Sequence, residues 1–218
     1  MKKAKIIAVF IAFILPFELN GIYNPLLADS LFWYWVADVI AWVVLPCGYL
    51  FYFIRSGTLM WGDLGLSIKN ENLNHFIFVI VVISILSVFI VRSADISSRI
   101  IFPTNYFRVH FNFEQTQPAA FPWYFLVGFY YSLCAGLMEE IFYRGVFATL
   151  FKQNSIHAFT YIVLSSLIFS SVHWEGGIHR LFVSFVFGLF AAAVFVKIKN
   201  LWPLIIGHTI ADMTYFCF

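Results

Sequence analysis

The stretch that decides the fold is Asn74-His-Phe-Ile-Phe-Val-Ile-Val-Val-Ile-Ser-Ile-Leu-Ser-Val-Phe-Ile-Val91, which contains no Asp, Glu, Lys or Arg. About 18 consecutive apolar residues are enough to cross the hydrocarbon core of a bilayer as a helix. The whole chain of 218 residues is 62% hydrophobic and 11% charged, whereas a soluble domain is about 45–50% apolar and about 25% charged. Lipid is therefore the expected solvent for most of this chain.

Six further apolar runs surround this stretch. They cover residues 5–22, 31–54, 122–151, 157–174, 180–198 and 201–217. Backbone polar groups in lipid must be bonded within their own segment, so each run predicts a helix. The run 122–151 is long for one span and holds three charges, which is compatible with a break or a tilt. The sequence thus predicts an all-α membrane protein, a bundle of about seven transmembrane helices.

The distribution of charge indicates how the chain meets its surroundings. If the N-terminus is cytoplasmic, eight basic residues fall inside (Lys2, Lys3, Lys5, Arg55, Lys69, Lys152, Lys197 and Lys199) and four outside (Arg92, Arg99, Arg108 and Arg180). This asymmetry favours a cytoplasmic N-terminus, and in a prokaryote the membrane is the cell membrane. The longest connection, 92–121, mixes aromatic residues with cations, which suits an interfacial segment or an ordinary covering loop. A net charge of +2 does not suggest nucleic acid.

Ionisable groups inside a membrane span are costly and mark functional sites by default. Glu18, Asp29 and Asp38 fall near a predicted outer boundary and are interpreted as interfacial or structural. Three other places lie deeper in the apolar runs and resist that interpretation.

The first of these places is Gly136-Leu-Met-Glu139-Glu140-Ile-Phe-Tyr-Arg144-Gly145. Residues four apart share a helix face, so Glu140 can pair with Arg144. Glu139 is turned about 100° away and has no basic residue three or four positions from it. Glu139 is therefore left available to exchange protons as a general base.

The second place is Phe169-Ser-Ser-Val-His173, and the third is His208-Thr-Ile-Ala-Asp212. The spacing of four in the third places an imidazole and a carboxylate on one helix face, where the acid can fix the imidazole tautomer. Each place alone is weak, since an isolated membrane histidine is more often a helix–helix hydrogen bond. If the three did not meet, the desolvation of several polar groups would go uncompensated, so we expect them to converge.

The residues Glu139-Glu140-xxx-Arg144, Phe169-xxx-His173 and His208-xxx-Asp212 resemble the motifs of the CPBP family, the CAAX proteases and bacteriocin-processing enzymes also called Abi proteins. This family includes the type II CAAX prenyl endopeptidases. The resemblance covers about 120–218, and Trp61-Gly-Asp-Leu-Gly-Leu66 is similar to a segment common before the family's core. We accordingly expect one integral-membrane domain over 1–218, with N-terminal helices and an interfacial loop in 1–120 and the protease core in 121–218.

The resemblance implies a glutamic intramembrane protease without a cofactor, which acts on a peptide or protein substrate that can be lipidated. Glu139 would be the general base and His173 its partner, while His208 and Asp212 would flank the oxyanion. Glu140, Arg144 and Phe169 would support the architecture. Many members have Asn at the position of Asp212; since an ionised Asp cannot donate a hydrogen bond, this Asp is either protonated or orients His208.

Two alternatives remain open from the sequence. Two histidines and a carboxylate can hold zinc as in a metalloprotease, although the helical HExxH pair is absent. A non-catalytic membrane scaffold or transporter is the other alternative, since intramembrane acids and histidines also form proton relays.

One geometric difficulty concerns His208. Helix lengths place Glu139 and His173 at similar depth, but His208 about 10 Å nearer the turn around Asn200. Either a protruding hairpin of the fourth and fifth spans or a deeply set turn between the sixth and seventh would reconcile them.

Overall fold

The computed structural model describes residues 3–27, 29–67, 72–109, 111, 113–153 and 157–217. Every regular element within these ranges is a helix. The long apolar runs of the sequence therefore form helices, as their need for internal backbone hydrogen bonds in lipid predicts.

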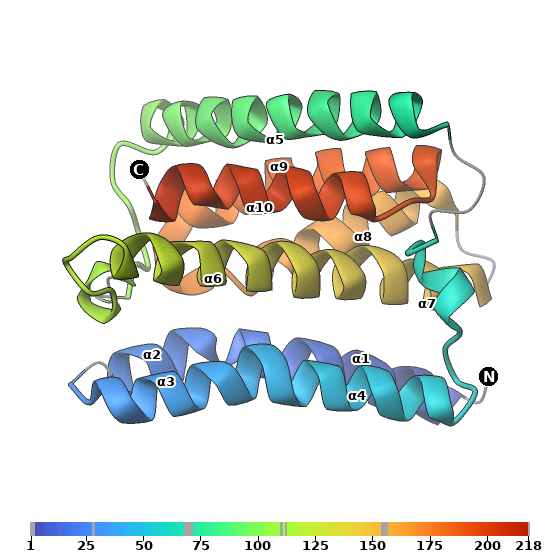
Figure 1. The fold of residues 1–218 in the computed structure, drawn as a ribbon, viewed down its shortest axis with the longest axis horizontal. Coiled ribbons are helices and arrows are strands. Elements are labelled where there is room, and N and C mark those ends of the chain that lie inside the picture. The colour runs from blue at the N-terminus through green and yellow to red at the C-terminus, as the bar shows by residue number, and fades with distance from the viewer. Residues whose placement is uncertain are drawn as a thin grey trace.

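The N-terminal helices form two rods that lie side by side (Figure 1). The first rod joins α1 (Lys3–Glu18) to α2 (Asn20–Leu27) through Leu19. The second is continuous through α3 (Leu31–Val39), the π-helical η1 (Ile40–Val44) and α4 (Leu45–Arg55). We refer to these four α-helices together with η1 as the N-terminal layer.

The remaining chain adds five rods. They are α5 (Leu73–Ile101), the continuous run of α6 (Trp123–Glu139), π-helical η4 (Glu140–Val146) and α7 (Phe147–Gln153), then α8 (Ala158–Ser171), α9 (Gly177–Ile198) and α10 (Trp202–Phe216). Short 3-10 turns lie between them, namely η2 (Trp61–Leu64), η3 (Phe113–Thr116) and η5 (Trp174–Gly176). The described helices thus give the predicted bundle of seven rods, and the long fourth run is continuous through a π-helical segment.

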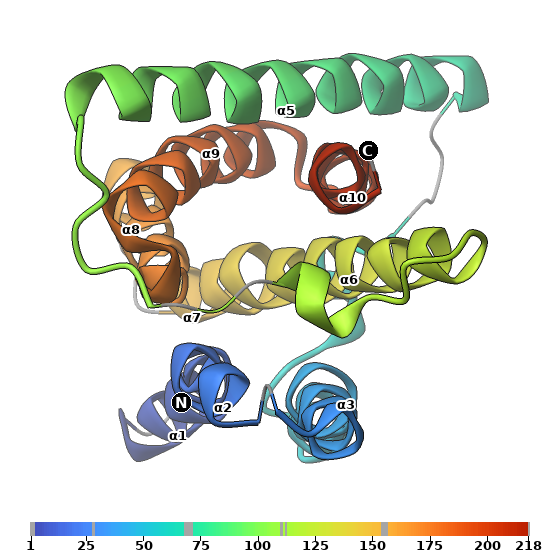
Figure 2. The same ribbon diagram turned by 90° about the vertical axis from the view of Figure 1, so that its left-hand side faces the viewer.

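The rods are arranged in layers around α6 and α10 (Figures 1 and 2). Helix α10 lies between α5 and α6, and α9 packs on both α8 and α5. The N-terminal layer covers the side of α6 that faces away from α10. Helix α6, which carries Glu139, and α10, which carries His208, are therefore neighbours at the centre of the bundle.

Several of these helices suit a bilayer. Among the residues that the structure describes, four helical stretches are long and apolar enough to cross a membrane: Leu31–Arg55, Leu73–Ile101, Trp123–Lys152 and Trp174–Ile198. Large apolar side chains point outward, as on α5, where Phe78, Ile85 and Phe89 are each at least 64% exposed. Such a surface is compatible with lipid rather than water, and the chain is an integral membrane protein.

Helix α5 is longer than predicted, because it continues to Ile101 instead of ending at Val91. The charges that suggested a loop are accommodated on the helix surface. Arg99 pairs with Asp95 one turn earlier, at 3.1 Å between Nε and Oδ2, and Arg92 donates to the carbonyl of Thr214 on α10. The connection from α5 to α6 therefore runs over 102–122 and begins ten residues later than the predicted connection over 92–121.

This connection covers the turn that follows α8. The backbone N–H of Val109 donates to the carbonyl of Glu175, and that of Ile178 donates to the carbonyl of Tyr106. The Asn105 side chain donates to the carbonyl of Gly176. These bonds hold η5 in place beneath the connection. In the described residues, the connection therefore acts as a covering loop.

Candidate active site

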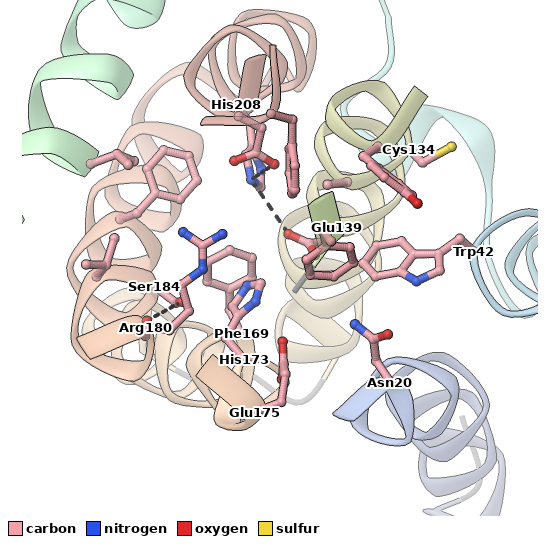
Figure 3. Close-up of a pocket in the computed structure, with 18 of the residues that line it drawn as sticks. Asn20, Trp42, Cys134, Glu139, Phe169, His173, Glu175, Arg180, Ser184 and His208 are labelled. Carbon is pink, nitrogen blue, oxygen red and sulfur yellow. Dashed lines mark hydrogen bonds and ion pairs between the residues drawn. The ribbon is translucent and has the colours of Figure 1, made fainter. Parts of the chain in front are cut away.

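The three polar places of the sequence meet around one cavity (Figure 3). Glu139 ends α6, His173 follows α8, and His208 and Asp212 lie one turn apart on α10. All four line the cavity, which has about 850 Å³ of empty space including its mouth. The expected convergence is therefore present, although the residues come from segments up to 73 positions apart.

The imidazole of His208 is the centre of the cluster. Its Nδ1 lies 2.9 Å from Oε1 of Glu140, which is hydrogen-bonding distance. Its Nε2 lies 3.7 Å from Oε2 of Glu139 and 3.6 Å from Oδ2 of Asp212. One nitrogen is thus occupied by a buried acid, while the other faces the two acids that line the cavity.

Adjacent acids share this imidazole because the helix changes its winding between them. Glu139 ends the α-helical part and Glu140 begins the π-helical η4. A π-turn is wider than an α-turn, so successive residues are rotated by a smaller angle, and such segments are frequent at functional sites. Both carboxylates therefore reach the same side chain, despite the separation of about 100° expected from an ordinary helix.

Close approach of α10 to α6 depends on Gly136. A Cβ at this position would lie 2.3 Å from Oγ1 of Thr209 and 2.9 Å from the carbonyl oxygen of Ile205. Small residues permit such contact between membrane helices. Gly136 thus sets the distance that brings His208 to the two glutamates.

Arg144 and Phe169 occupy the supporting positions that were predicted. Arg144 is fully buried, with Nε 3.3 Å from Oε2 of Glu140. Its guanidinium lies 4.3 Å from the ring centroid of Phe169 and 5.9 Å from that of Phe187. The Glu140–Arg144 pair is therefore confirmed as a contact, and it holds the carboxylate that binds His208.

His173 lies beyond α8, which ends two residues before it and not at 174 as predicted. Its backbone N–H donates to Ser170, and its carbonyl accepts from Gly176, which fixes the turn. The imidazole packs edge-on against Phe169 at 5.1 Å between ring centroids. It makes no hydrogen bond within the described ranges and lines the cavity, so its nitrogens are available to a bound molecule.

The difficulty over the depth of His208 is resolved by a protruding hairpin. Leu201, where α10 starts, lies beside Gly145, since a Cβ on this glycine would be 3.1 Å from Cδ1 of Leu201. The rod of α6 continues beyond Gly145 through α7 to Gln153. The turn between α9 and α10 is also tied to the segment after η2, where Leu201 N–H donates to the carbonyl of Gly65.

The cavity has further polar walls that the sequence analysis did not assign to it. Asn20, Asp38 and Trp42 reach it from the N-terminal layer, and Glu175 and Arg180 from η5 and α9. Asp38 is 3% exposed and accepts a hydrogen bond from Tyr130 at 2.8 Å, which agrees with the structural alternative given for it and adds a place in the cavity wall. The sequence feature that points to Asp38 is an acid inside an apolar run, because an ionisable group within a membrane span is a functional candidate by default.

Metal binding was the other open question about these donors. Among the residues that the structure describes, no three His, Cys, Asp or Glu side chains are grouped as ligands of a metal ion. The short contacts of His208 are instead a hydrogen bond and ion-pair contacts with carboxylates.

Residues 121–214 match the model of a family described as "Type II CAAX prenyl endopeptidase Rce1-like". The matched segment contains all seven residues that the motifs singled out: Glu139, Glu140, Arg144, Phe169, His173, His208 and Asp212. The chain has no significant match among curated proteins or among solved structures.

Proposed function

We propose that this membrane protein is a glutamic endopeptidase of the CPBP type, because residues 121–214 match the family model of the Rce1-like type II CAAX prenyl endopeptidases. It hydrolyses a peptide bond in a C-terminal or leader segment of a membrane-associated substrate that can be lipidated. The observation that carries the proposal is that Glu139 lies beside His208 and lines one cavity with His173 and Asp212.

The first step is the activation of water. Glu139 takes a proton from a water molecule whose oxygen attacks the carbonyl carbon of the scissile bond, and His173 holds that water from the other side of the cavity. The two groups suit this task because both side chains line the cavity and, within the described chain, neither the Glu139 carboxylate nor the His173 imidazole makes a hydrogen bond. The proton then passes from Glu139 to the leaving amine as the C–N bond breaks.

The second requirement is a donor for the developing oxyanion. His208 supplies it through Nε2–H, while Nδ1–H donates to Glu140 at 2.9 Å. Both nitrogens donate only when the imidazole carries two protons. The Glu140–Arg144 pair keeps this ring oriented, which makes Glu140 and Arg144 positioning residues.

Asp212 acts by orienting His208. Its Oδ2 lies 3.6 Å from Nε2 of His208, on the nitrogen that turns towards the substrate. An ionised carboxylate is an acceptor only, so it directs the N–H rather than donating to the oxyanion itself. Asn at this position would donate directly, and Asp212→Asn therefore retains activity.

The test is cleavage of a quenched fluorescent peptide ending in a prenylated Cys-aliphatic-aliphatic-X sequence, by protein reconstituted in nanodiscs. Wild type cleaves it, and mass spectrometry locates the bond. Glu139→Gln lowers kcat by at least about 10³-fold, and His173→Gln by about 10²- to 10⁴-fold, because each removes a partner in proton transfer. Asp95→Asn, the same change of acid to amide on the outer face of α5, retains full activity.

Two results would contradict this mechanism. Retained cleavage by Glu139→Gln would remove the assigned base. Loss of wild-type activity on treatment with 1,10-phenanthroline, with recovery on addition of zinc and one equivalent of bound zinc in the purified protein, would establish a metalloprotease instead.

The orientation belongs to the same proposal, with the N-terminus cytoplasmic and, in a prokaryote, the cell membrane as its location. The excess of Lys and Arg on the side of the membrane where the N-terminus lies supports this orientation. Labelling of a single cysteine introduced at Ser56 or at Asn105 by an impermeant maleimide tests it, because only the Asn105 variant should react from outside intact cells.

A further inference from the structure

Arg180 is a cation inside the cavity that the proposed mechanism does not use. It lies near the start of α9, and its guanidinium points into the cavity towards the centre of the site (Figure 3). Among the described residues that line the cavity, it is the only Lys or Arg. Gly176 leaves room for the Arg180 side chain, because a Cβ at position 176 would lie 2.4 Å from the Cβ of Arg180.

The guanidinium has no ion-pair partner within the described part of the chain. Glu175 and Asp212 line the same cavity, but neither lies within the 4.0 Å of a salt bridge to Arg180. A charge held inside a membrane protein without a partner is costly and indicates function. The walls of the cavity combine aromatic rings, such as Phe187 and Phe216, with four acids: Asp38, Glu139, Glu175 and Asp212.

The surroundings of Arg180 leave its hydrogen-bonding edge free. Its Cζ lies 4.5 Å from the ring centroid of Tyr215, a contact that stabilises the cation through the face of the ring. The planar fork of N–H donors remains available, and its geometry matches a carboxylate, which it can bind through two parallel hydrogen bonds.

We propose that Arg180 binds the C-terminal α-carboxylate of the substrate. This inference rests on the proposed function and selects the C-terminal tail over the leader segment as the substrate class. A leader segment has no free carboxylate near its cleavage point, whereas a short tail beyond the scissile bond ends in one. A cavity of this size holds a ligand of a few residues, so the tail between Glu139 and Arg180 is short.

The experiment compares two substrates that differ in a single group. The prenylated reporter peptide is prepared with a free C-terminal carboxylate and with a C-terminal carboxamide. Its cleavage is measured with wild-type protein in nanodiscs. Its binding is measured with Glu139→Gln, so that no turnover occurs. The free acid should bind and be cleaved about 10- to 100-fold better, as expected for a charge-assisted pair out of water.

The matched variants assign that preference to Arg180. Arg180→Gln should lower kcat/KM for the acid to the level of the amide and leave the amide unchanged, whereas Arg180→Lys should keep part of the preference. Arg99→Gln, which loses an exposed arginine of α5, should behave as wild type. Melting temperatures in nanodiscs check that each variant folds, and the comparison of the two peptides on wild type needs no variant.

The outcomes separate the two proposals. Equal binding of acid and amide by Glu139→Gln, or binding of neither, overturns the carboxylate site. An equal loss for both peptides in Arg180→Gln also overturns it, because Arg180 would then only balance Glu175 and Asp212. If wild type cleaves the acid and the amide equally well, the protease function is retained and only the carboxylate site is rejected. If wild type and Glu139→Gln release the same products, the protease function itself is rejected.

Discussion

The two halves of the molecule differ in what their interiors chiefly contain. Around α6, α8, α9 and α10 the interior contains charged residues and small ones: Glu139, Glu140, Arg144 and His208 are buried, and Gly136 and Gly188 sit at helix contacts. The N-terminal layer packs chiefly through large rings, as where Phe13 stacks on Phe142 at 4.4 Å between centroids. Small residues let membrane helices approach closely, whereas large rings bury a large area in the contacts that they make.

This difference suggests a division of labour between the halves. The family match covers 121–214, which includes the charged interior but none of the N-terminal layer. Yet Asn20, Asp38 and Trp42 of that layer line the same cavity. The charged interior would then carry out the chemistry, while the N-terminal layer forms a wall that selects the substrate.

The largest effect that can break this division is expected at His208. Replacement by Ala removes the proposed oxyanion donor and should lower kcat by about 10²- to 10³-fold, with KM nearly unchanged. Initial rates on the prenylated reporter in nanodiscs measure both constants. His75→Ala, on the exposed first turn of α5, is the control. A His208→Ala protein with normal kcat would move the chemistry away from α10.

The next largest effect is expected from Gly136→Ala, which acts on the distance between helices and not on any reacting group. The added Cβ would meet Thr209 and Ile205 of α10 at 2.3 and 2.9 Å, so α10 must shift. We expect a loss of about 1–3 kcal/mol of stability and a fall in kcat of about 10- to 100-fold, because catalysis is sensitive to displacements of about 1 Å.

Gly48→Ala in α4 is the matched control, because nothing lies within 4 Å of a Cβ at that position. It should leave kcat and the melting temperature in nanodiscs unchanged or slightly raise the latter, since Ala favours a helix over Gly. Equal behaviour of the two variants would show that close approach of α6 and α10 does not position the site.

The comparison of halves also explains what the sequence could predict. The apolar runs have the length of spans, so the seven rods follow from composition. The Glu140–Arg144 contact follows from spacing on one helix, and the meeting of Glu139 with His208 from the cost of leaving either unpaired. These are local or energetic arguments that need no knowledge of tertiary structure.

The missed features depend on contacts between distant segments. Asp38 is held at the cavity by a hydrogen bond that the hydroxyl of Tyr130, 92 residues later, donates to its carboxylate. The end of α5 was misplaced because Arg92 is satisfied by Thr214 of α10, which turns an apparent loop charge into a helix contact. The π-helical turn at Glu140 has no sequence signature that separates it from an ordinary turn.

A smaller effect, on binding and not on turnover, is expected at Asp38. Asp38→Asn keeps the shape of the wall and can still accept from Tyr130, but it removes a charge from the cavity. KM should change by roughly threefold to tenfold while kcat stays constant, the pattern of an interaction made equally in ground and transition states. Asp29→Asn, an exposed acid just before α3, serves as control, and a change in kcat would place Asp38 with the chemistry.

The smallest overall effect on catalysis, less than about twofold in kcat, is expected from Phe13→Ala, although the stability cost is about 3 kcal/mol for a buried ring. Phe13 is 4% exposed and contacts Phe142 and Phe53. Thermal unfolding and kcat, both in nanodiscs, are compared with those of Phe51→Ala, whose ring is 63% exposed on α4. Phe142 lies in η4, three residues after Glu139, so this variant tests whether the aromatic packing merely supports the π-helical turn or also sets its geometry. A fall in kcat parallel to the fall in stability would mean that the N-terminal layer helps to place the adjacent acids, and the division between chemistry and wall would then be lost.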